Sequence, residues 1–346
     1  MKKTDVLIVG QGLAGTLLAF ELYFAGVKFC IVNNPKKSTA TRVAAGMVNP
    51  LVFKRMTKSW MVDDLLPVMK KRYKMLEEML GERFYFDWPV VKPLSAQETE
   101  LWQQRKADKA FGKYIQSITA NSPVKHLQTA PAYGVVHGSG YLKTGNFLEA
   151  ARQFFQKSEM LIESDFPATK GNFQYSAFQD FTFEKIVFCQ GHYLNTHPLF
   201  DFVRLQPAKG EVLQIYAPDL SEEYILNKRV FVLPVGKHRF KVGSTYEWDD
   251  LINIPTEKGK ASILERLESL IPIHYRIEKH WAGIRPTVAD RRPVLGKHPE
   301  HQYFYVFNGL GTKGVMLAPY FAAETRKLLQ NDSYKLNKEV DISRFW

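Results

Sequence analysis

The chain has 346 residues, enough for one large core or two modest ones, and we expect two domains. Hydrophobic residues make up 45% and charged residues 24%, an ordinary soluble globular balance. No apolar run approaches the roughly 20 residues that span a bilayer, so we predict a cytoplasmic protein without a membrane partner. The net charge of +12 admits nucleic acid as a partner, but the basic residues are spread along the chain, which favours a generally basic surface.

The N-terminal stretch predicts a βαβ unit. An apolar strand at Val6–Val9 leads into a helical pattern that stops at Gly26, and a second strand covers Lys28–Val32. The turn between strand and helix reads Gly10-Gln11-Gly12-Leu13-Ala14-Gly15, a G-x-G-x-x-G spacing in its proper context. Gly10 allows the tight turn, Gly12 lets a pyrophosphate approach the backbone and Gly15 lets helix and strand pack closely. The helix start, with Leu13 and Ala14, turns its amides toward the phosphates. We therefore predict an ADP-containing dinucleotide here.

The end of the second strand departs from this pattern. An Asp or Glu usually stands there and accepts from the adenosine ribose hydroxyls, but this chain has Asn33 followed by Asn34. An amide still accepts one such bond, so we predict weaker or rearranged ribose recognition. No basic residue replaces the acid, which argues against a 2′-phosphate ligand.

Further elements follow in chain order. A segment of small residues over 38–50, with Ala45, Gly46, Met47 and Val48, suits backbone that lies against a flat ligand. Helices are predicted at 60–80, 95–111 (opened by a Ser95/Glu98 capping box), 144–157, 258–270 and 315–330. Strand signals cover 135–141, 161–163, 173–175, 185–189, 211–216, 230–233, 240–243 and 303–307.

A second glycine-rich turn follows the last strand. It contains Gly309, Gly311, Thr312, Lys313 and Gly314 and precedes a helix, so its amides either meet a ligand or form an ordinary turn. Strand–helix units typical of a parallel sheet thus lie at both ends of the chain, and strands typical of an antiparallel sheet lie between them. We predict an α/β fold: a discontinuous Rossmann-like domain from 1–80, 135–205 and 280–346, and an α+β substrate domain from 81–134 and 206–279 on an antiparallel sheet.

Six motifs in this order resemble the FAD-dependent amino-acid and amine oxidoreductases of the D-amino-acid oxidase, glycine oxidase and sarcosine oxidase type. After the first glycine motif come the 44–50 segment, the strand that ends at Gly191, and the turn 243–247. Gly283-Ile284-Arg285-Pro286-Thr287 with the following 290–296 segment is the most specific mark, and 308–319 resembles the closing flavin segment. The 311–319 stretch also resembles the oxidase domain of the enzyme that matures methylaminomethyl-uridine in tRNA, whose methyltransferase half has no counterpart here.

The resemblance implies FAD and hydride transfer from an amine C–H to flavin N5, followed by imine hydrolysis. Arg285 is the candidate to hold a substrate carboxylate, because a guanidinium grips it with two bonds. Tyr246 either adds a hydroxyl to that carboxylate or only packs. Lys313 either stabilises the reduced ring or points to solvent, and Arg42 either meets the pyrophosphate or is solvated.

The predicted cofactor is noncovalent FAD, since the 41–44 segment lacks His and no cysteine follows Cys189. No metal site is predicted. Three functions stay open: oxidation of a small carboxylate-bearing amine with oxygen as a possible acceptor, the same chemistry on tRNA, and flavin binding without turnover. The sequence leaves the oligomeric state undetermined.

Overall fold

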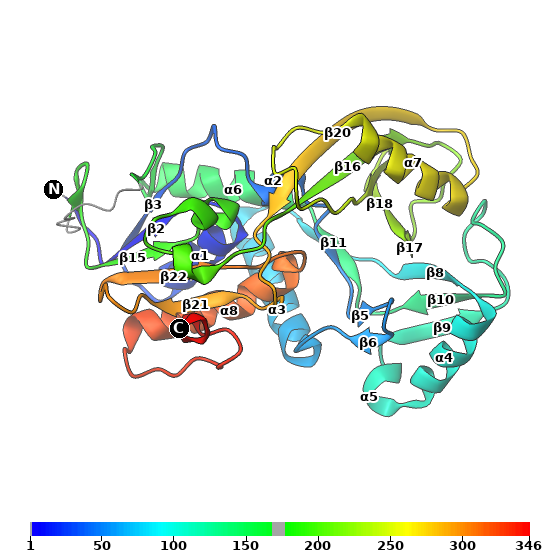
Figure 1. Cartoon of the computed structure of the whole chain (residues 1–346), viewed down its shortest axis with the longest axis horizontal. Coiled ribbons are helices and arrows are strands. Elements are labelled where there is room, and N and C mark those ends of the chain that lie inside the picture. Colours follow the sequence, from blue (N-terminus) through cyan, green and yellow to red (C-terminus); the bar gives the residue numbers. More distant parts are fainter. Residues whose placement is uncertain (1, 168–176) are drawn as a thin grey trace.

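Two large sheets stand side by side in the computed structural model, which describes residues 2–167 and 177–346 (Figure 1). The helices α1, α6 and α8 gather around one sheet, and α7 covers the other. The strand predicted at 173–175 lies outside the described residues. Both ends of the chain lie with the first sheet (Figure 1). Early, middle and late segments of the chain form this layer, and the segments between them form the second sheet.

The first sheet has six strands in the order β12-β3-β2-β15-β22-β21. All neighbours are parallel except β21 and β22, which are antiparallel. The strands are β2 (Val6–Val9), β3 (Phe29–Val32), β12 (Leu161–Ile162), β15 (Lys185–Phe188), β21 (Val294–Lys297) and β22 (Phe304–Asn308). The helices of this layer are α1 (Leu13–Phe24), α3 (Val62–Leu80), α6 (Thr144–Lys157) and α8 (Gly314–Gln330). The strands β2, β3 and β22 are buried along their whole length, because helices and loops cover both faces.

The second sheet has eight strands in the order β20-β16-β19-β18-β17-β8-β10-β9, antiparallel except for the β17–β8 pair. Its strands are β8 (Val90–Leu94), β9 (Ile115–Thr119), β10 (Ala132–Val136), β16 (Ala208–Tyr216), β17 (Ile225–Lys228), β18 (Val230–Gly236), β19 (Arg239–Gly243) and β20 (Arg276–Arg285). Helix α7 (Glu257–Leu270) packs Ile263 and Leu267 against Leu213 and Phe240 of this sheet, and so separates one face from solvent. Helices α4 (Ala96–Ala107) and α5 (Lys109–Gly112) border its far edge.

Short elements join these layers. A three-stranded sheet has the order β4-β11-β7, and β5 pairs with β6. The remaining elements are β1 (Lys2–Lys3), α2 (Ala40–Val43), β4 (Met47–Val48), β5 (Leu51–Val52), β6 (Thr57–Lys58), β7 (Tyr85–Asp87), β11 (Gly140–Leu142), β13 (Ala177–Phe178), β14 (Phe181–Thr182) and the 3-10 turns η1 (Gly191–Thr196), η2 (Asp201–Val203) and η3 (Ile342–Phe345).

The predicted fold class is confirmed: a mixed parallel sheet of Rossmann type stands beside a mainly antiparallel sheet. The Ser95/Glu98 capping box is also confirmed. The helix predicted over 95–111 is wrong as one element. Asp108 accepts a hydrogen bond from Ala110 N with its own side chain, which ends α4 and starts α5. The domain boundaries stay a prediction, and β10 and β20 run across the predicted positions 135 and 280.

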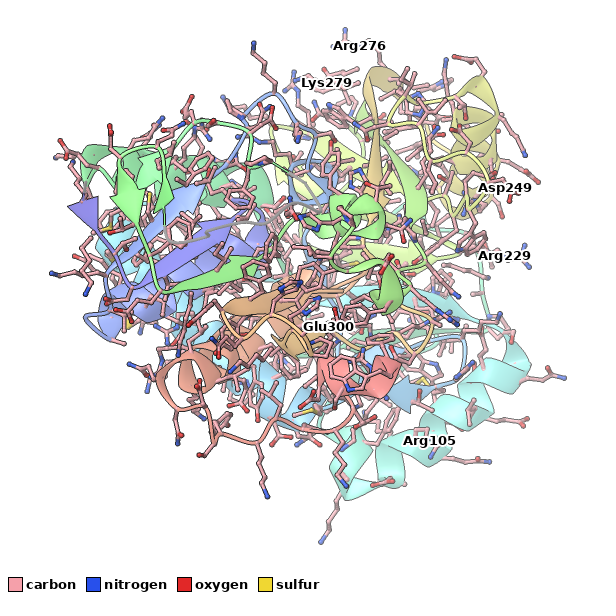
Figure 2. The ribbon with its side chains drawn as sticks, turned by 60° about the vertical axis from the view of Figure 1, so that its left-hand side comes forward. Arg105, Arg229, Asp249, Arg276, Lys279 and Glu300 are labelled. Atoms are coloured by element: carbon pink, nitrogen blue, oxygen red, sulfur yellow. The ribbon has the colours of Figure 1, made fainter. Side chains whose placement is uncertain are left out.

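Charged side chains project from separate parts of the surface. Arg105 belongs to α4, Arg229 to the turn between β17 and β18, and Arg276 and Lys279 to β20 (Figure 2). Within the described residues no helix is long and apolar enough to cross a membrane. Those residues also contain no group of three or more His, Cys, Asp or Glu side chains that could hold a metal ion.

Candidate functional site

A cavity of about 480 Å³ lies between the two sheets. Its walls come from the turns that follow β2, β3, β15 and β22 on one side and from β16, β18 and β20 on the other. The carboxyl ends of parallel strands are where open α/β sheets bind ligands. The cavity therefore joins the predicted nucleotide end to the predicted substrate sheet.

The first glycine motif shapes the wall at the start of α1. Gly10 has φ +104°, a conformation that a side chain would strain. A Cβ built on Gly15 would lie 1.9 Å from Gly10 O, so Gly15 allows the close packing of helix on strand but does not line the cavity. Helix α1 has Gly12 as its N-cap, without a side-chain cap and without an acid in the first turn. Its N-terminal end therefore attracts an anion.

Helix α8 brings a second uncapped N-terminus to the same cavity. Its N-cap is Lys313, again without a side-chain cap or an acidic residue in the first turn. Gly311, Thr312, Lys313 and Gly314 line the cavity, but Gly309 does not. A Cβ on Gly309 would lie 3.0 Å from methyl groups of Val288 and Val294, so this glycine serves the packing of the turn.

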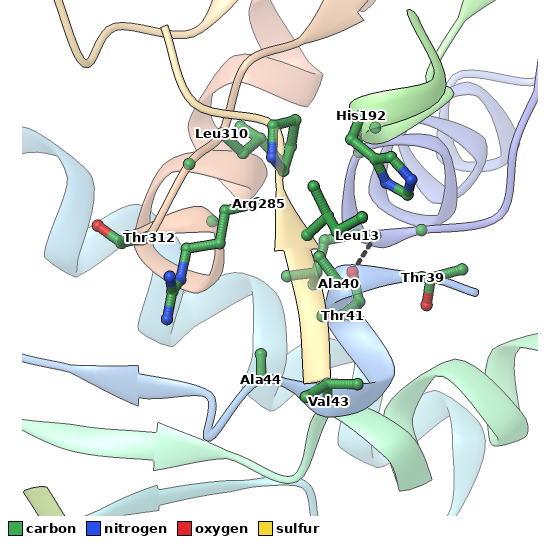
Figure 3. A pocket seen from close by; sticks show the side chains of 18 of the residues that line it. Leu13, Thr39, Ala40, Thr41, Val43, Ala44, His192, Arg285, Leu310 and Thr312 are labelled. Carbon is green, nitrogen blue, oxygen red and sulfur yellow. Dashed lines mark hydrogen bonds between the residues drawn. The ribbon is translucent and has the colours of Figure 1, made fainter. Parts of the chain in front are cut away.

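The segment after β3 crosses the cavity wall through α2. Thr41 Oγ1 accepts a hydrogen bond from Leu13 N at 3.3 Å, and this bond is drawn in Figure 3. Ala45, Gly46 and Met47, which the sequence placed against a ligand, line the cavity. Arg42 is exposed and Val48 is buried in β4, and neither lines the cavity.

A lysine of the second sheet holds this segment in place by a hydrogen bond. Lys241 Nζ donates to Ala44 O at 3.1 Å, and burial lowers the pKa of Lys241. Gly283 of β20 lets Val43 approach, because a Cβ there would lie 3.0 Å from Val43 Cβ. Sequence reasoning missed Lys241, since a lysine in an alternating strand signals an exposed position.

The β3 end of the cavity is lined by Asn33, Asn34, Lys37 and Asp165. Asn33 Oδ1 accepts from Gln11 N at 3.0 Å, and Asn34 Oδ1 accepts from Lys36 N at 2.8 Å. Both amide oxygens of this pair thus have a backbone partner. The predicted ribose contact of Asn33 is untested and stays a prediction.

Arg285 occupies the opposite end of the cavity, which we call the Arg285 end. The side chain leaves the last residue of β20 on the side of Thr312 (Figure 3). Its Nη1 donates to Lys209 O at 3.3 Å and Thr245 O at 3.2 Å, and its Nη2 donates to Ser244 Oγ at 2.8 Å. A Cβ on Gly210 would lie 1.9 Å from Nη2. The guanidinium therefore takes the place that a side chain at 210 would fill, and its orientation is fixed.

Tyr246 covers the guanidinium from the outer side. Its ring centroid is 4.5 Å from Arg285 Cζ, a cation–π contact, and its ring also stacks on Trp248 at 6.0 Å. The side chain is 53% exposed at the cavity wall. Burial lowers the pKa of Arg285 from its usual value, but a guanidinium remains charged at neutral pH.

Lys313 points inward and not to solvent. Its Nζ donates to Ser59 Oγ at 2.5 Å, and Ser59 in turn donates to Asn49 O at 2.9 Å. Burial, aided by the charge of Arg291, lowers the pKa of Lys313 from 10.5 to about 8. An ammonium group with so few partners carries an uncompensated positive charge beside the N-terminus of α8.

Several lining residues escaped sequence reasoning. His192 follows Gly191, and burial lowers its pKa to about 4, so its imidazole is neutral at pH 7. Leu51, Val52, Phe53, Val212 and Phe231 give the Arg285 end an apolar wall, and Asn227 adds an amide. These positions belong to a short hairpin and to strands of another sheet, and no motif marks them.

Comparison with known proteins identifies the family. The model of the FAD dependent oxidoreductase family matches residues 5–328. The chain belongs to this family. It is therefore an enzyme, an oxidoreductase whose cofactor is FAD. The two helix N-termini, whose N-cap residues have no side-chain cap, and the glycine turns of the cavity suit such a cofactor, because they offer amides to phosphate and ring carbonyl oxygens.

Relatives and solved structures extend this likeness over nearly the whole chain. Glycine oxidase from Bacillus licheniformis is 24% identical over 92% of this chain and 90% of that protein. The crystal structure of glycine oxidase from Geobacillus kaustophilus superimposes with a TM-score of 0.80 at 20% identity, covering 98% of both chains. L-proline dehydrogenase from P. horikoshii also gives 0.80, at 17% identity over 99% of this chain and 98% of that one. The structural likeness shows the fold.

Proposed function

We propose that this enzyme oxidises the C–N bond of a small amino acid or secondary amine that carries a carboxylate. The observation that carries the proposal is the fixed, half-buried guanidinium of Arg285 in the cavity wall, with Gly210 leaving room for it. A planar guanidinium recognises a carboxylate and sets its angle. The names of the relatives, glycine oxidase above all, support the same class of substrate.

Bound FAD would take up the hydride equivalent from the substrate carbon. The chain's residues would hold it along the cavity, with the pyrophosphate against Gly10, Gly12 and the start of α1 and the ring near the start of α8. The residues Gly15, Val48 and Gly309, predicted to bind the cofactor, support this wall from behind. Arg42 is exposed away from the wall, and its predicted contact has no geometric support.

The Arg285 end of the cavity then binds the substrate and orients its amine for oxidation. Arg285 binds the carboxylate and directs the neighbouring carbon toward the middle of the cavity. The apolar wall of Leu51, Val212 and Phe231 excludes water and disfavours an ammonium ion, so the amine binds neutral, with its lone pair free to form the C=N bond. As the C–H hydride leaves, the lone pair becomes the second bond of a cationic C=N group, an iminium ion, which water then hydrolyses to a carbonyl compound and an amine or ammonia with release of a proton. Lys313 supplies positive charge for the negative charge that develops on the cofactor.

The test is a substrate panel with three variants. Purified wild-type protein is given glycine, sarcosine, proline and D-amino acids without oxygen, and loss of the yellow flavin absorbance is recorded. We expect reduction by at least one of them, and Arg285→Ala lowers kcat/KM roughly 100- to 1,000-fold while FAD stays bound. Gly210→Ala keeps every charge but displaces the guanidinium, and lowers kcat/KM at least roughly tenfold. Gly145→Ala, with no atom within 4 Å of the added methyl, is the matched control.

Other outcomes would decide against the proposal. Wild-type rates in Arg285→Ala would show that the carboxylate is not held there. If no amine of the panel reduces the flavin, binding to tRNA that weakens steeply with salt would support the RNA-modifying alternative. Neither turnover nor tRNA binding would favour a flavin-binding protein without amine oxidation.

A further inference from the structure

We infer that Asp165 is the carboxylate that binds the adenosine ribose of FAD, in place of the acid missing at the end of β3. Asp165 follows β12, the parallel neighbour of β3, and the two strands end at the same edge of the sheet. It is the only Asp or Glu among the described residues that line the cavity. The inference concerns cofactor binding and does not depend on which amine is oxidised.

Neither asparagine of the β3 end offers a carboxylate-like acceptor. Gln11 N occupies Asn33 Oδ1, and Lys36 N occupies Asn34 Oδ1. An amide oxygen has two lone pairs, so each of these oxygens keeps one acceptor position, whereas a carboxylate has about four. Ribose hydroxyl groups are donors as well as acceptors, so their hydrogens need an oxygen with free lone pairs.

The carboxylate of Asp165 supplies that oxygen and is held at the right place. Asn34 Nδ2 donates to Asp165 Oδ2 at 2.8 Å, and Lys37 Nζ lies 2.6 Å from Asp165 Oδ1. A carboxylate has about four acceptor positions, so two partners leave room for ribose hydroxyls. The hydrogen bond from Lys37 lowers the pKa of Asp165, which keeps the group ionised at neutral pH.

This arrangement also explains why two asparagines stand where one acid is usual. Asn33 holds the backbone of the glycine turn through Gln11 N, and Asn34 orients Asp165. The acceptor for the ribose has thus moved from β3 to the segment after β12. Lys37 is neutralised by the same carboxylate and does not form a 2′-phosphate site.

The experiment measures affinity of the deflavinated protein for FAD and for FMN, which lacks the adenosine half. Asp165→Ala and Asp165→Asn should weaken FAD binding roughly 3- to 30-fold and leave FMN binding unchanged. Asp219→Asn, an exposed aspartate away from the cavity wall, is the control for loss of one negative charge and should change neither. If the ratio of FAD to FMN affinity stays within twofold of wild type in Asp165→Ala, the inference fails.

A second measurement distinguishes two roles of Asp165: direct binding of the ribose hydroxyls, or only holding Lys37 in position through their ion pair. ADP and 2′,3′-dideoxy-ADP, which lacks both ribose hydroxyls, compete with FAD for the deflavinated protein. Wild type and Lys37→Met should prefer ADP, and Asp165→Ala should lose the preference. A preference that survives in Asp165→Ala, or that is absent from wild type, would place the hydroxyls elsewhere and overturn the inference.

Discussion

The two ends of the cavity are built from different materials. At the start of α1 the wall is made of backbone from one continuous segment, 9–14, and it works because side chains are missing at Gly10 and Gly12. At the Arg285 end the wall is made of side chains that come from five separate strands and a loop. The first end depends on local conformation, and the second depends on charges brought together by packing.

This difference separates the consequences of substitution. A substitution at the first end changes the backbone conformation of the glycine turn or the packing of α1. It should therefore lower the free energy of unfolding and weaken the retention of flavin. A change at the second end leaves the sheets intact and should appear in turnover or in its pH dependence. Single substitutions at the two ends can therefore break this separation or confirm it.

Gly15→Ala should give the largest effect. The added methyl would have to lie 1.9 Å from Gly10 O, so α1 must move off β2. We expect a loss of at least about 2 kcal/mol in the free energy of unfolding, together with loss of FAD, because helix start and glycine turn shift together. Urea denaturation and flavin absorbance measure the two effects. Gly145→Ala is the control, and equal stabilities of the two variants would contradict the close packing described here.

Lys313→Met should separate stability from function. The folded pKa of Lys313 is lowered, so between about 8 and 10.5 the unfolded chain holds a proton that the folded chain lacks. The contribution of Lys313 to stability is therefore greatest above 10.5 and is lost as the pH falls through about 8. We expect Lys313→Met to raise the free energy of unfolding of the deflavinated protein at pH 7 by on the order of 1–3 kcal/mol, with a smaller gain near pH 10.

The same substitution should slow flavin reduction roughly 10- to 100-fold at pH 7, because it removes the positive charge beside α8. Urea titrations at two pH values and anaerobic stopped-flow measurements check the two arms. Lys258→Met, whose side chain is 92% exposed, is the matched control. A Lys313→Met protein that is both less stable and fully active would contradict this account.

Tyr246→Phe should give the smallest effect. The ring keeps its contact with Arg285. The lost hydroxyl has no hydrogen-bond partner among the described residues. We expect kcat/KM within about threefold of wild type, whereas Tyr246→Ala loses roughly tenfold with the cation–π contact. Steady-state kinetics on the best substrate of the panel decide the point. Equal losses in both variants would mean that the hydroxyl itself holds the carboxylate, as one sequence hypothesis has it.

The sequence was sufficient for the backbone-built end. A strand, a glycine turn and a helix that follow one another closely must meet in space, so the residues from Gly10 to Ala14 could be placed on a ligand cavity without a structure. Gly311 to Gly314 follow by the same reasoning. Arg285 was found through family resemblance, although the ten-residue strand β20 that carries it was not predicted.

Long-range packing and local side-chain contacts determine which of the other predicted residues line the cavity and where a predicted helix ends. Gly15, Val48 and Gly309 share a motif with lining residues, yet they do not line the cavity. Gly15 lies on the side of α1 that packs on Gly10, and at Val48 and Gly309 the neighbours on both sides line the cavity while the residue itself faces away. The helix over 95–111 is broken by one aspartate side chain that competes for a backbone amide, a local choice that hydrophobic periodicity does not register.

The sequence alone was enough for the N-terminal βαβ unit, the glycine turns and a dinucleotide as the kind of ligand, since these depend on interactions between near neighbours in the chain. FAD followed from the family resemblance. Three contacts follow from long-range packing: Gly210 makes room for Arg285, Lys313 is buried against Ser59, and Asp165 lies beside Asn34. These pairs are separated by 75, 254 and 131 positions in the sequence. Contacts across such distances form when strands far apart in the chain pair in one sheet and when helices and loops pack on it, and no local propensity specifies them.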